Sequence, residues 1–432
     1  MPVVIGSYFF APKDFLMHQF NILDIISILL FLAAILTYIN IKVLKLPTTI
    51  GLMVLALGLS VILLLLGYAF PTLPETAREI LNTLNFSDLL LNLMLSFLLF
   101  AGALTTHLEK LREEIWPILT LSTVGILITT GIIGSAMYVI LPVLGLHVDF
   151  IHCLLFGALI SPTDPIAVLA MLKTMNVSKN LEIKIAGESL FNDGIGVVVF
   201  LTLLKLASPD NAEISAGEVA ALFGQEVIGG VALGAALGYL LFHAFRVVDT
   251  QHVELEVLMT LAGVIGGTQL AHVFHVSAPL AMVIAGLFIG NEGRDLKMAE
   301  YKSEYIIKFW HLLDEVLNAI LFMLIGLEMM VLTFEGKYLI AGLLAIPVAL
   351  LSRYIGVGLP ITLMKRRRTF EPGTIKVLTW GGLRGGISVA LALSLPDFAE
   401  KSLMVSITYT VVIFSIVVQG LTLKKVLNKV SG

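Results

Sequence analysis

Charged residues are scarce in this chain. Asp, Glu, Lys and Arg together make up 13% of its 432 residues, about half of the roughly 25% that is usual in soluble globular domains. Hydrophobic residues reach 58% and the mean hydropathy is +0.97, so a soluble fold of this size could not cover its surface with polar groups. The composition excludes a soluble enzyme, a DNA-binding domain and a secreted disulfide scaffold, and it indicates a polytopic membrane protein.

Three further absences narrow the function. The chain has a single cysteine, Cys153, so no internal disulfide can form. It contains no Gly-x-x-x-x-Gly-Lys-Ser/Thr motif, so ATP-driven pumping has no support in the sequence. The net charge of −4 is too small to indicate nucleic acid or another polyanion as a partner. We therefore expect no ATP, no nucleic acid and no cofactor.

Long apolar runs predict an all-α protein with about thirteen transmembrane helices, because each crossing needs about 20 residues. The predicted spans are 20–44, 47–69, 87–108, 115–144, 149–173, 181–206, 217–247, 253–275, 277–291, 304–332, 338–364, 374–395 and 402–425. The runs are continuously apolar and lack the alternation of barrel strands. The first nineteen residues have no basic leading segment, so we interpret them as a retained leader rather than a signal peptide.

The distribution of Lys and Arg predicts the orientation. Twenty of the 27 lie in the loops after odd-numbered spans or in the C-terminal tail, and five lie at the N-terminus or after even-numbered spans. Because basic residues concentrate in cytoplasmic loops, we expect an extracellular N-terminus and a cytoplasmic C-terminus. The cluster Lys365–Arg368 is interpreted as a cytoplasmic anchor, with an anionic-lipid site as the alternative.

Five charged residues lie well inside predicted spans: Asp164, Glu188, Asp193, Arg353 and Arg384. A charge at the bilayer centre costs at least about 2.5–3.5 kcal/mol on insertion scales, so such side chains face a cavity or a partner. Three acids against two bases leave one carboxylate without a compensating cation. A carboxylate removed from water binds either a proton or a metal cation, so the surplus indicates a site at which these two exchange.

The fifth span contains the sequence SPTDP at 161–165. Its two prolines remove backbone donors and should free the carbonyls of Ala158 and Ser161. We expect the helix to unwind around Thr163, which is tolerated at membrane depth around a cavity or inside protein. Asp164 can cap the second half-helix, and the freed carbonyls can serve as oxygen ligands for a hard cation.

The sixth span contains GESLFNDG at 187–194. Glu188 and Asn192 are four residues apart, and so are Ser189 and Asp193, so all four share one broad helical face. Two carboxylates within six residues favour a functional site over a polar seam between helices.

The twelfth span contains GGLRGG at 381–386, and four glycines around Arg384 predict a second broken helix. If spans 1–6 and 8–13 are repeats joined by span 7, both breaks fall in the fifth helix of a repeat. Paired broken helices at corresponding positions are typical of inverted-repeat transporters with a site at the midplane. Arg384 would lie near the half-helix ends and offset carbonyl dipoles or acidic charge.

These motifs resemble the monovalent cation–proton antiporters of the NhaP and sodium/hydrogen-exchanger type. The resemblance rests on SPTDPIAV at 161–168, GESLFNDG at 187–194 and GGLRGG at 381–386, in family order and on the expected helices. It implies a prokaryotic plasma-membrane protein that contacts lipid, forms a homodimer and contributes to pH homeostasis.

The resemblance also implies two domains. An interface domain that mediates dimerisation would comprise residues 1–110 (spans 1–3) and 209–334 (spans 7–10). A transport domain would comprise residues 111–208 (spans 4–6) and 335–432 (spans 11–13) and would move against it.

The resemblance assigns Asp193 as the principal carboxylate that binds cation or proton. Asp164, Ser189 and the Thr163 carbonyl would complete the shell of a sodium or lithium ion, and Asn192 would hold the crossing region together.

A glutamate–arginine ion pair beside the site is a further implication of the family. Glu188 matches this glutamate by motif, and Arg353 is the expected partner by its span. Electrogenic relatives have two adjacent aspartates where this chain has Asn192-Asp193. Because Asn192 cannot release a proton, we expect electroneutral exchange of one cation for one proton by alternating access.

Three other functions stay open at this stage. Potassium/proton exchange is possible because Thr and Ser oxygens do not fix the size of the ion. An intramembrane aspartyl hydrolase using Asp164 and Asp193 is disfavoured, since nearby arginines would stabilise both carboxylates as anions whereas such a dyad must retain one proton. A conducting channel would leave the two broken helices harder to explain.

Overall fold

The structure is a computed structural model that describes residues 21–70, 72–83, 86–172, 179–207, 215–247, 252–295, 300–330, 335–396 and 398–431. The predicted N-terminal leader lies outside these residues. All regular secondary structure within the described ranges is helical, as the sequence predicts.

The first half of the chain forms α1 (Ile22–Ile39), α2 (Thr48–Leu66), α3 (Thr72–Thr83), α4 (Phe86–Leu89), α5 (Leu95–Thr105), α6 (Leu108–Glu113), α7 (Ile115–Thr120), α8 (Ile126–Val143), α9 (Phe150–Ile160), α10 (Ile166–Leu172) and α11 (Lys179–Ala207). The second half forms α12 (Ala216–Val247), α13 (Val253–Val273), α14 (Ala278–Asp295), α15 (Glu300–Glu328), α16 (Gly336–Met364), α17 (Thr374–Trp380), α18 (Gly386–Leu393), α19 (Lys401–Phe414) and α20 (Gly420–Ser431). A short π-helical turn extends α1 at Asn40–Leu44, and others join neighbouring helices at Leu90–Met94, Leu121–Gly125 and Ser415–Gln419.

Each predicted span corresponds to helix. Within the described ranges, nine helical stretches are long and apolar enough to cross a membrane, and they match nine of the predicted spans. The other four predicted spans, the third, fifth, ninth and twelfth, contain shorter helices, two of them broken near the middle. The chain is therefore an integral membrane protein with about thirteen spans.

Two details differ from the sequence prediction. The helix α3 lies between the second and third spans and was not predicted, because Glu75, Arg78 and Glu79 make its sequence too polar for a span. It is an amphipathic helix. The ninth span, predicted as short, belongs to a helix of 18 residues, α14.

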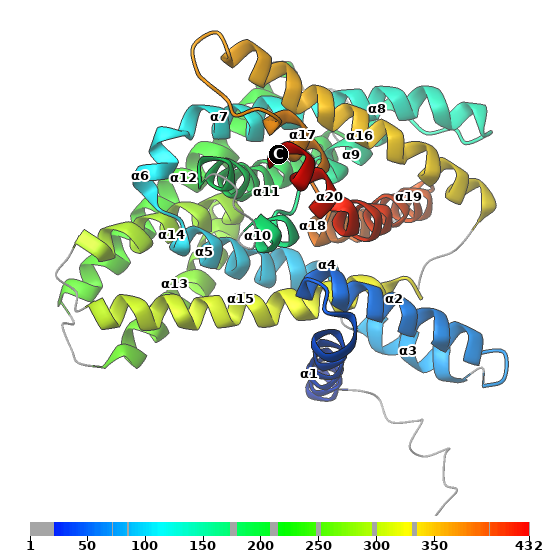
Figure 1. The fold of residues 1–432 in the computed structure, drawn as a ribbon, viewed down its shortest axis with the longest axis horizontal. Coiled ribbons are helices and arrows are strands. Elements are labelled where there is room, and N and C mark those ends of the chain that lie inside the picture. Colours follow the sequence, from blue (N-terminus) through cyan, green and yellow to red (C-terminus); the bar gives the residue numbers. More distant parts are fainter. Residues whose placement is uncertain are drawn as a thin grey trace, which may run out of the picture.

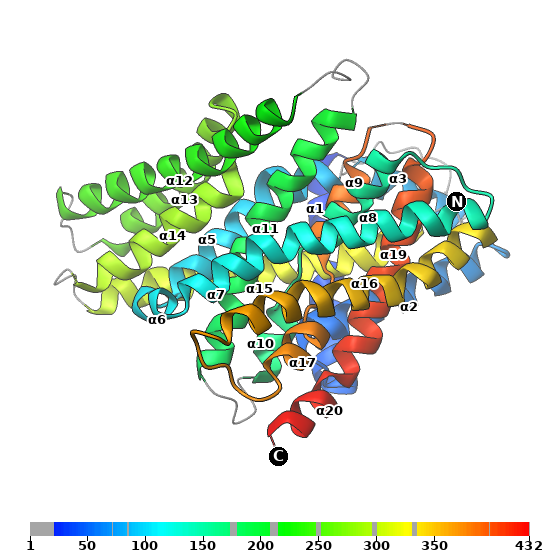
Figure 2. The same cartoon turned by 90° about the horizontal axis from the view of Figure 1, so that it is seen from above.

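The helices form two groups (Figures 1 and 2). The helices α12, α13 and α14 gather at one end of the molecule, whereas α8, α16 and α19 lie at the other. Within the first group α14 packs on α12 and α5, and within the second α16 packs on α8 and α19. The helix α11 contacts α9, which packs on α8 of the second group, and it also contacts α12 and α14 of the first. Residues on α11 therefore lie between the groups.

Two broken helices meet where the site forms. The break between α9 and α10 spans residues 161–165, and the break between α17 and α18 spans 381–385. The backbone N–H of Asp164 donates to the carbonyl of Leu383 at 2.7 Å, which makes an antiparallel bridge between the two extended segments. The bridge satisfies backbone groups that the helices leave open.

Glycine at position 385 follows from this close approach. A Cβ atom at Gly385 would lie 2.6 Å from Oδ2 of Asp164. The glycine-rich motif therefore allows one broken helix to pass directly against the carboxylate of the other.

Candidate functional site

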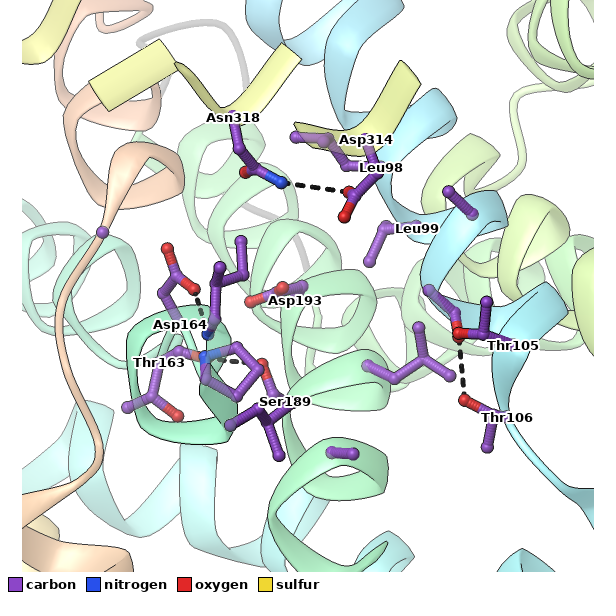
Figure 3. A pocket seen from close by; sticks show the side chains of 18 of the residues that line it. Leu98, Leu99, Thr105, Thr106, Thr163, Asp164, Ser189, Asp193, Asp314 and Asn318 are labelled. Atoms are coloured by element: carbon purple, nitrogen blue, oxygen red, sulfur yellow. Dashed lines mark hydrogen bonds between the residues drawn. The ribbon is translucent and has the colours of Figure 1, made fainter. Parts of the chain in front are cut away.

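A cavity of about 570 Å³ reaches the crossing of the broken helices. Its walls come from α5, α11, α15 and α18 and from the break between α9 and α10. Asp164 and Asp193 both line it, and Figure 3 shows them beside Ser189. Asp164 is partly exposed, whereas Asp193 exposes 9% of its surface. The structure thus brings together two carboxylates from the fifth and sixth predicted spans.

The unwound segment is bound to α11 by side chains of the second motif. Ser189 donates its hydroxyl to the Thr163 carbonyl at 2.7 Å. The Asn192 amide donates to the Thr163 hydroxyl at 2.8 Å and to Glu188 Oε1 at 2.9 Å. Because Thr163 has no helical partner for its carbonyl, these bonds fix the conformation of the break.

Asp164 caps the helix that follows the break. Its Oδ1 accepts a hydrogen bond from the Ile166 backbone N–H at 2.9 Å, the interaction expected of an aspartate at a helix start. The carboxylate therefore has one oxygen fixed by the backbone while it faces the cavity.

Glu188 and Arg353 form a bidentate ion pair. The guanidinium Nη1 and Nη2 lie 2.8 and 2.9 Å from the two carboxylate oxygens of Glu188. The side chains are 5% and 3% exposed, with Arg353 the more exposed. Arg353 also donates from Nε to the Leu378 carbonyl at 3.3 Å, so it connects α11 and α16 to α17.

Arg384 neutralises backbone dipoles rather than a carboxylate. Its Nη1 donates to the carbonyls of Ser161 and, at 3.1 Å, Pro162. The backbone N–H of Arg384 donates to the Ser415 hydroxyl at 2.9 Å. The Ser161 carbonyl was expected to be free for a cation, but Arg384 occupies it. The Ala158 carbonyl, also expected to be free, accepts from the Ser161 N–H at 3.3 Å.

The charge pairing at the crossing of the broken helices differs from the sequence prediction, which left one carboxylate without a compensating cation. Arg353 is paired with Glu188 and Arg384 faces carbonyls. Among the described residues, neither Asp164 nor Asp193 forms an ion pair. Two carboxylates, rather than one, therefore face the cavity without a direct cationic partner.

Two further acids line this cavity, Asp314 and Glu182, and neither was assigned a role from the sequence. Asp314 on α15 lines the same cavity, and Asn318 donates to it at 3.0 Å; Figure 3 shows this pair across from Asp193. Helical spacing places these two residues and His311 on one face of α15, and this polar stripe within an apolar span could have revealed them. Glu256 and Glu328 are also buried, at 1% and 6% exposure, so the count of three intramembrane acids was incomplete.

Few charged side chains are available as ligands for a cation at this site. No cluster of three His, Cys, Asp or Glu side chains with metal-ligand geometry occurs among the described residues. A cation at Asp164 and Asp193 would need neutral oxygens from Ser189 and Thr163 as well, the ligand mixture typical of hard cations.

Comparison with known proteins identifies the family. The model of the family described as "Sodium/hydrogen exchanger, transmembrane" matches residues 28–429. The chain belongs to this family. It is 48% identical to the Na(+)/H(+) antiporter NhaP of Pseudomonas aeruginosa over 415 residues, covering 94% of this chain and 97% of the relative. It is 35% identical to the Na(+)/H(+) antiporter NhaH of Halobacillus dabanensis over 423 residues, covering 96% and 99%.

A solved structure shares the exchanger fold. The sodium proton antiporter MjNhaP1 from Methanocaldococcus jannaschii superposes with a TM-score of 0.73, at 21% identity, over 94% of this chain and 97% of its own. The resemblance to exchangers inferred from the three motifs is confirmed. Because the family consists of transporters, the intramembrane hydrolase is discarded.

Proposed function

We propose that this protein is a sodium(lithium)/proton antiporter that works by alternating access in the plasma membrane of a prokaryote. The observation that carries the proposal is the placement of Asp164 and Asp193 in a cavity at the crossing of two broken helices. The names of relatives that match almost end to end support sodium and proton as the substrates. Such exchange would contribute to pH homeostasis.

Asp193 is the group for which proton and cation compete. It is nine-tenths buried yet lines the cavity, so its negative charge calls for a proton or a cation. The Ser189 hydroxyl donates its proton to the Thr163 carbonyl. The hydroxyl oxygen of Ser189 and the carbonyl oxygen of Thr163 both keep lone pairs that can bind a cation. With Asp164, these groups form the proposed shell.

The proposed exchange is electroneutral. Glu188 is held by Arg353 and Asn192, so it is not available for transport, and Asn192 has no proton to release. If Asp193 alone changes its occupancy while Asp164 stays ionised, each crossing carries one positive charge in either direction.

The lining of the cavity indicates from which side of the membrane the proposed ion site is accessible. Besides the carboxylates it is lined by His107, Lys110 and Lys179, which lie at span ends that the positive-inside rule assigns to the cytoplasm. None of the described lining residues belongs to a predicted extracellular loop. We therefore assign this structure to an inward-open state, with the N-terminus outside and the C-terminus in the cytoplasm.

The proposed mobile unit comprises residues 111–208 and 335–432, moving against residues 1–110 and 209–334. A separate apolar cluster supports this division, because α5 and α12–α15 alone supply its buried residues, which include Trp310. The breaks in α9/α10 and α17/α18 occupy corresponding places in two six-span halves, which supports an inverted repeat.

We also propose a homodimer formed through the interface domain. The helix α12 exposes large apolar side chains, with Ile228, Tyr239 and Leu240 at 72%, 58% and 62%. Native mass spectrometry of the protein released from lipid would test this, and a purely monomeric mass would contradict it.

The decisive test of function is proton movement in vesicles. Membrane vesicles containing the protein are acidified, and a pH-sensitive dye reports proton efflux when sodium or choline chloride is added. We expect dequenching with sodium and lithium but not with choline, and loss of the response in Asp193→Asn. Retained transport by a well-folded Asp193→Asn variant would refute the assigned role of this residue.

Controls separate this result from misfolding. Glu315→Gln removes an acid on α15 whose side chain is 67% exposed, and it should leave transport unchanged. A potential-sensitive dye tests the stoichiometry, since sustained sodium-driven transport that itself creates a membrane potential is incompatible with one-for-one exchange. A response to potassium equal to that to sodium would favour potassium/proton exchange instead.

A further inference from the structure

A second, separate hollow lies at the end of α16. Its volume is about 550 Å³, and it lies between the segment that follows α16 and the junction of α6 with α7. Charged and polar residues line it together with one aromatic ring, and the full set is Glu114, Lys365, Arg366, Arg367, Arg368, Thr369 and Phe370. The proposed transport site shares none of these residues.

One side of this hollow is fixed by specific contacts. Arg368 donates from Nη1 to the Glu113 carbonyl at 2.8 Å and lies 4.0 Å from Glu114. Glu114 also pairs with Lys184 at 2.9 Å, and the Lys184 ammonium lies 5.5 Å from the centre of the Phe370 ring. Lys184 is 4% exposed, so the base of the hollow is a buried, satisfied network.

The other cations at the rim have no such partner. Lys365, Arg366 and Arg367 are exposed, and none of them forms an ion pair with an acid among the described residues. The single carboxylate in the lining, Glu114, is already bound to Lys184 and faces Arg368. The rim therefore presents three uncompensated positive charges in a concave site.

The position of the hollow selects the kind of anion. Lys365 directly follows α16, whose last turns expose Leu359 and Leu363 at 48% and 58%. Trp116, two residues after Glu114, is 67% exposed. Exposed apolar side chains on a transmembrane helix face acyl chains, and an exposed Trp at a span end marks the membrane–water boundary. The charged hollow thus lies at headgroup depth beside the hydrocarbon.

We propose that this hollow binds the headgroup of an anionic phospholipid. Arginine forks bind phosphate oxygens in bidentate fashion, and Arg366 and Arg367 are free to do so. The acyl chains would lie along the apolar surface of α16. The predicted cytoplasmic location agrees with the attraction of basic juxtamembrane segments to anionic lipid. The sequence alone favoured a simple anchor; the concave shape and the unpaired arginines favour a binding site.

The site is connected to the transport machinery. Lys184 belongs to α11 and lies one turn before Glu188, and it contacts both Glu114 and Phe370. A bound headgroup would hold the segment 365–370 against α7 and α11. We therefore expect lipid binding to stabilise the folded protein, a consequence that does not depend on the ion transported.

The test is a thermal unfolding assay on the full-length protein in neutral detergent. Phosphatidylglycerol, phosphatidylcholine or inorganic phosphate is added at equal phosphate concentration. The pocket variant is Arg366→Gln/Arg367→Gln. The control variant is Lys424→Gln/Lys425→Gln, which removes the same charge from exposed positions on α20 at the same predicted membrane face.

We expect phosphatidylglycerol to raise the unfolding midpoint of the wild type and the control variant but not that of the pocket variant. The proposal would be overturned if phosphatidylglycerol raised the midpoint of the pocket variant as much as that of the wild type. It would also be overturned if both variants lost the rise equally, because the lipid would then respond to general surface charge. The same rise with inorganic phosphate or phosphatidylcholine would also overturn it. If the double variant does not fold, Arg366→Gln and Arg367→Gln separately should each lose part of the rise, and an undiminished rise in both would refute the site.

Discussion

Replacing Arg353 by alanine should destabilise the protein, because it leaves the buried Glu188 carboxylate without its counter-charge. The guanidinium makes two hydrogen bonds of 2.8 and 2.9 Å to Glu188, and both side chains are at least 95% buried. In Arg353→Ala the carboxylate keeps the Asn192 amide at 2.9 Å but loses its counter-charge.

The magnitude follows from the burial of the pair. Removing one partner of a buried ion pair costs about 3–5 kcal/mol. Unfolding entropy is about 2.1 cal/mol/K per residue, so for 432 residues this cost corresponds to a fall in Tm of about 3–6 °C. The Tm of Glu188→Ala should fall at least as far, because the buried guanidinium of Arg353 stays charged and then has no counter-charge.

The assay is thermal unfolding of the purified protein in detergent, followed by intrinsic fluorescence. The double variant Glu188→Gln/Arg353→Met removes both charges and should be more stable than either single alanine variant, since it leaves no uncompensated charge. A wild-type Tm for Arg353→Ala would refute the reasoning, and so would a double variant that is no more stable than the single alanine variants.

Three further outcomes are expected. The apparent sodium affinity in the vesicle assay should weaken as pH falls because proton and cation compete for one carboxylate, and an affinity independent of pH would count against a shared site. Gly385→Ala should destabilise the folded protein by about 1–3 kcal/mol, because the added methyl group overlaps Asp164. Gly131→Ala should not destabilise it, since the space around Gly131 is open. Equal unfolding midpoints for the two variants would contradict this prediction. Asp314→Asn should weaken sodium affinity several-fold by removing a negative charge from the cavity, unlike the exposed Glu315→Gln, and an unchanged affinity would exclude Asp314 from the ion's surroundings.

The sequence was informative wherever a residue type determines the backbone conformation around it. The prolines at 162 and 165 break a helix wherever it packs, because each removes a backbone donor, and the structure has its break at 161–165. The helix α3 was missed for the converse reason, since an amphipathic segment can be a loop or a surface helix depending on what it packs against.

Local sequence carries little information on charge partners. Arg353 and Glu188 are 165 positions apart, and their pairing was expected from the family resemblance rather than from any local pattern. For Arg384 the sequence left carbonyl dipoles and acidic charge open as partners, and in the structure it faces the Ser161 carbonyl. Asp314 joins the cavity from α15, a helix to which the sequence assigned no site residue. Such contacts arise from the packing of distant helices.

The sequence by itself determined that the chain resides in a membrane, how many times it crosses, and which two spans are broken. These follow from the cost of charge in hydrocarbon and from the chemistry of proline and glycine, which act within a few residues. The tertiary structure alone decided which carboxylates remain without a cation. That outcome depends on where Arg353 and Arg384 come to rest, and helix packing rather than local sequence sets their positions.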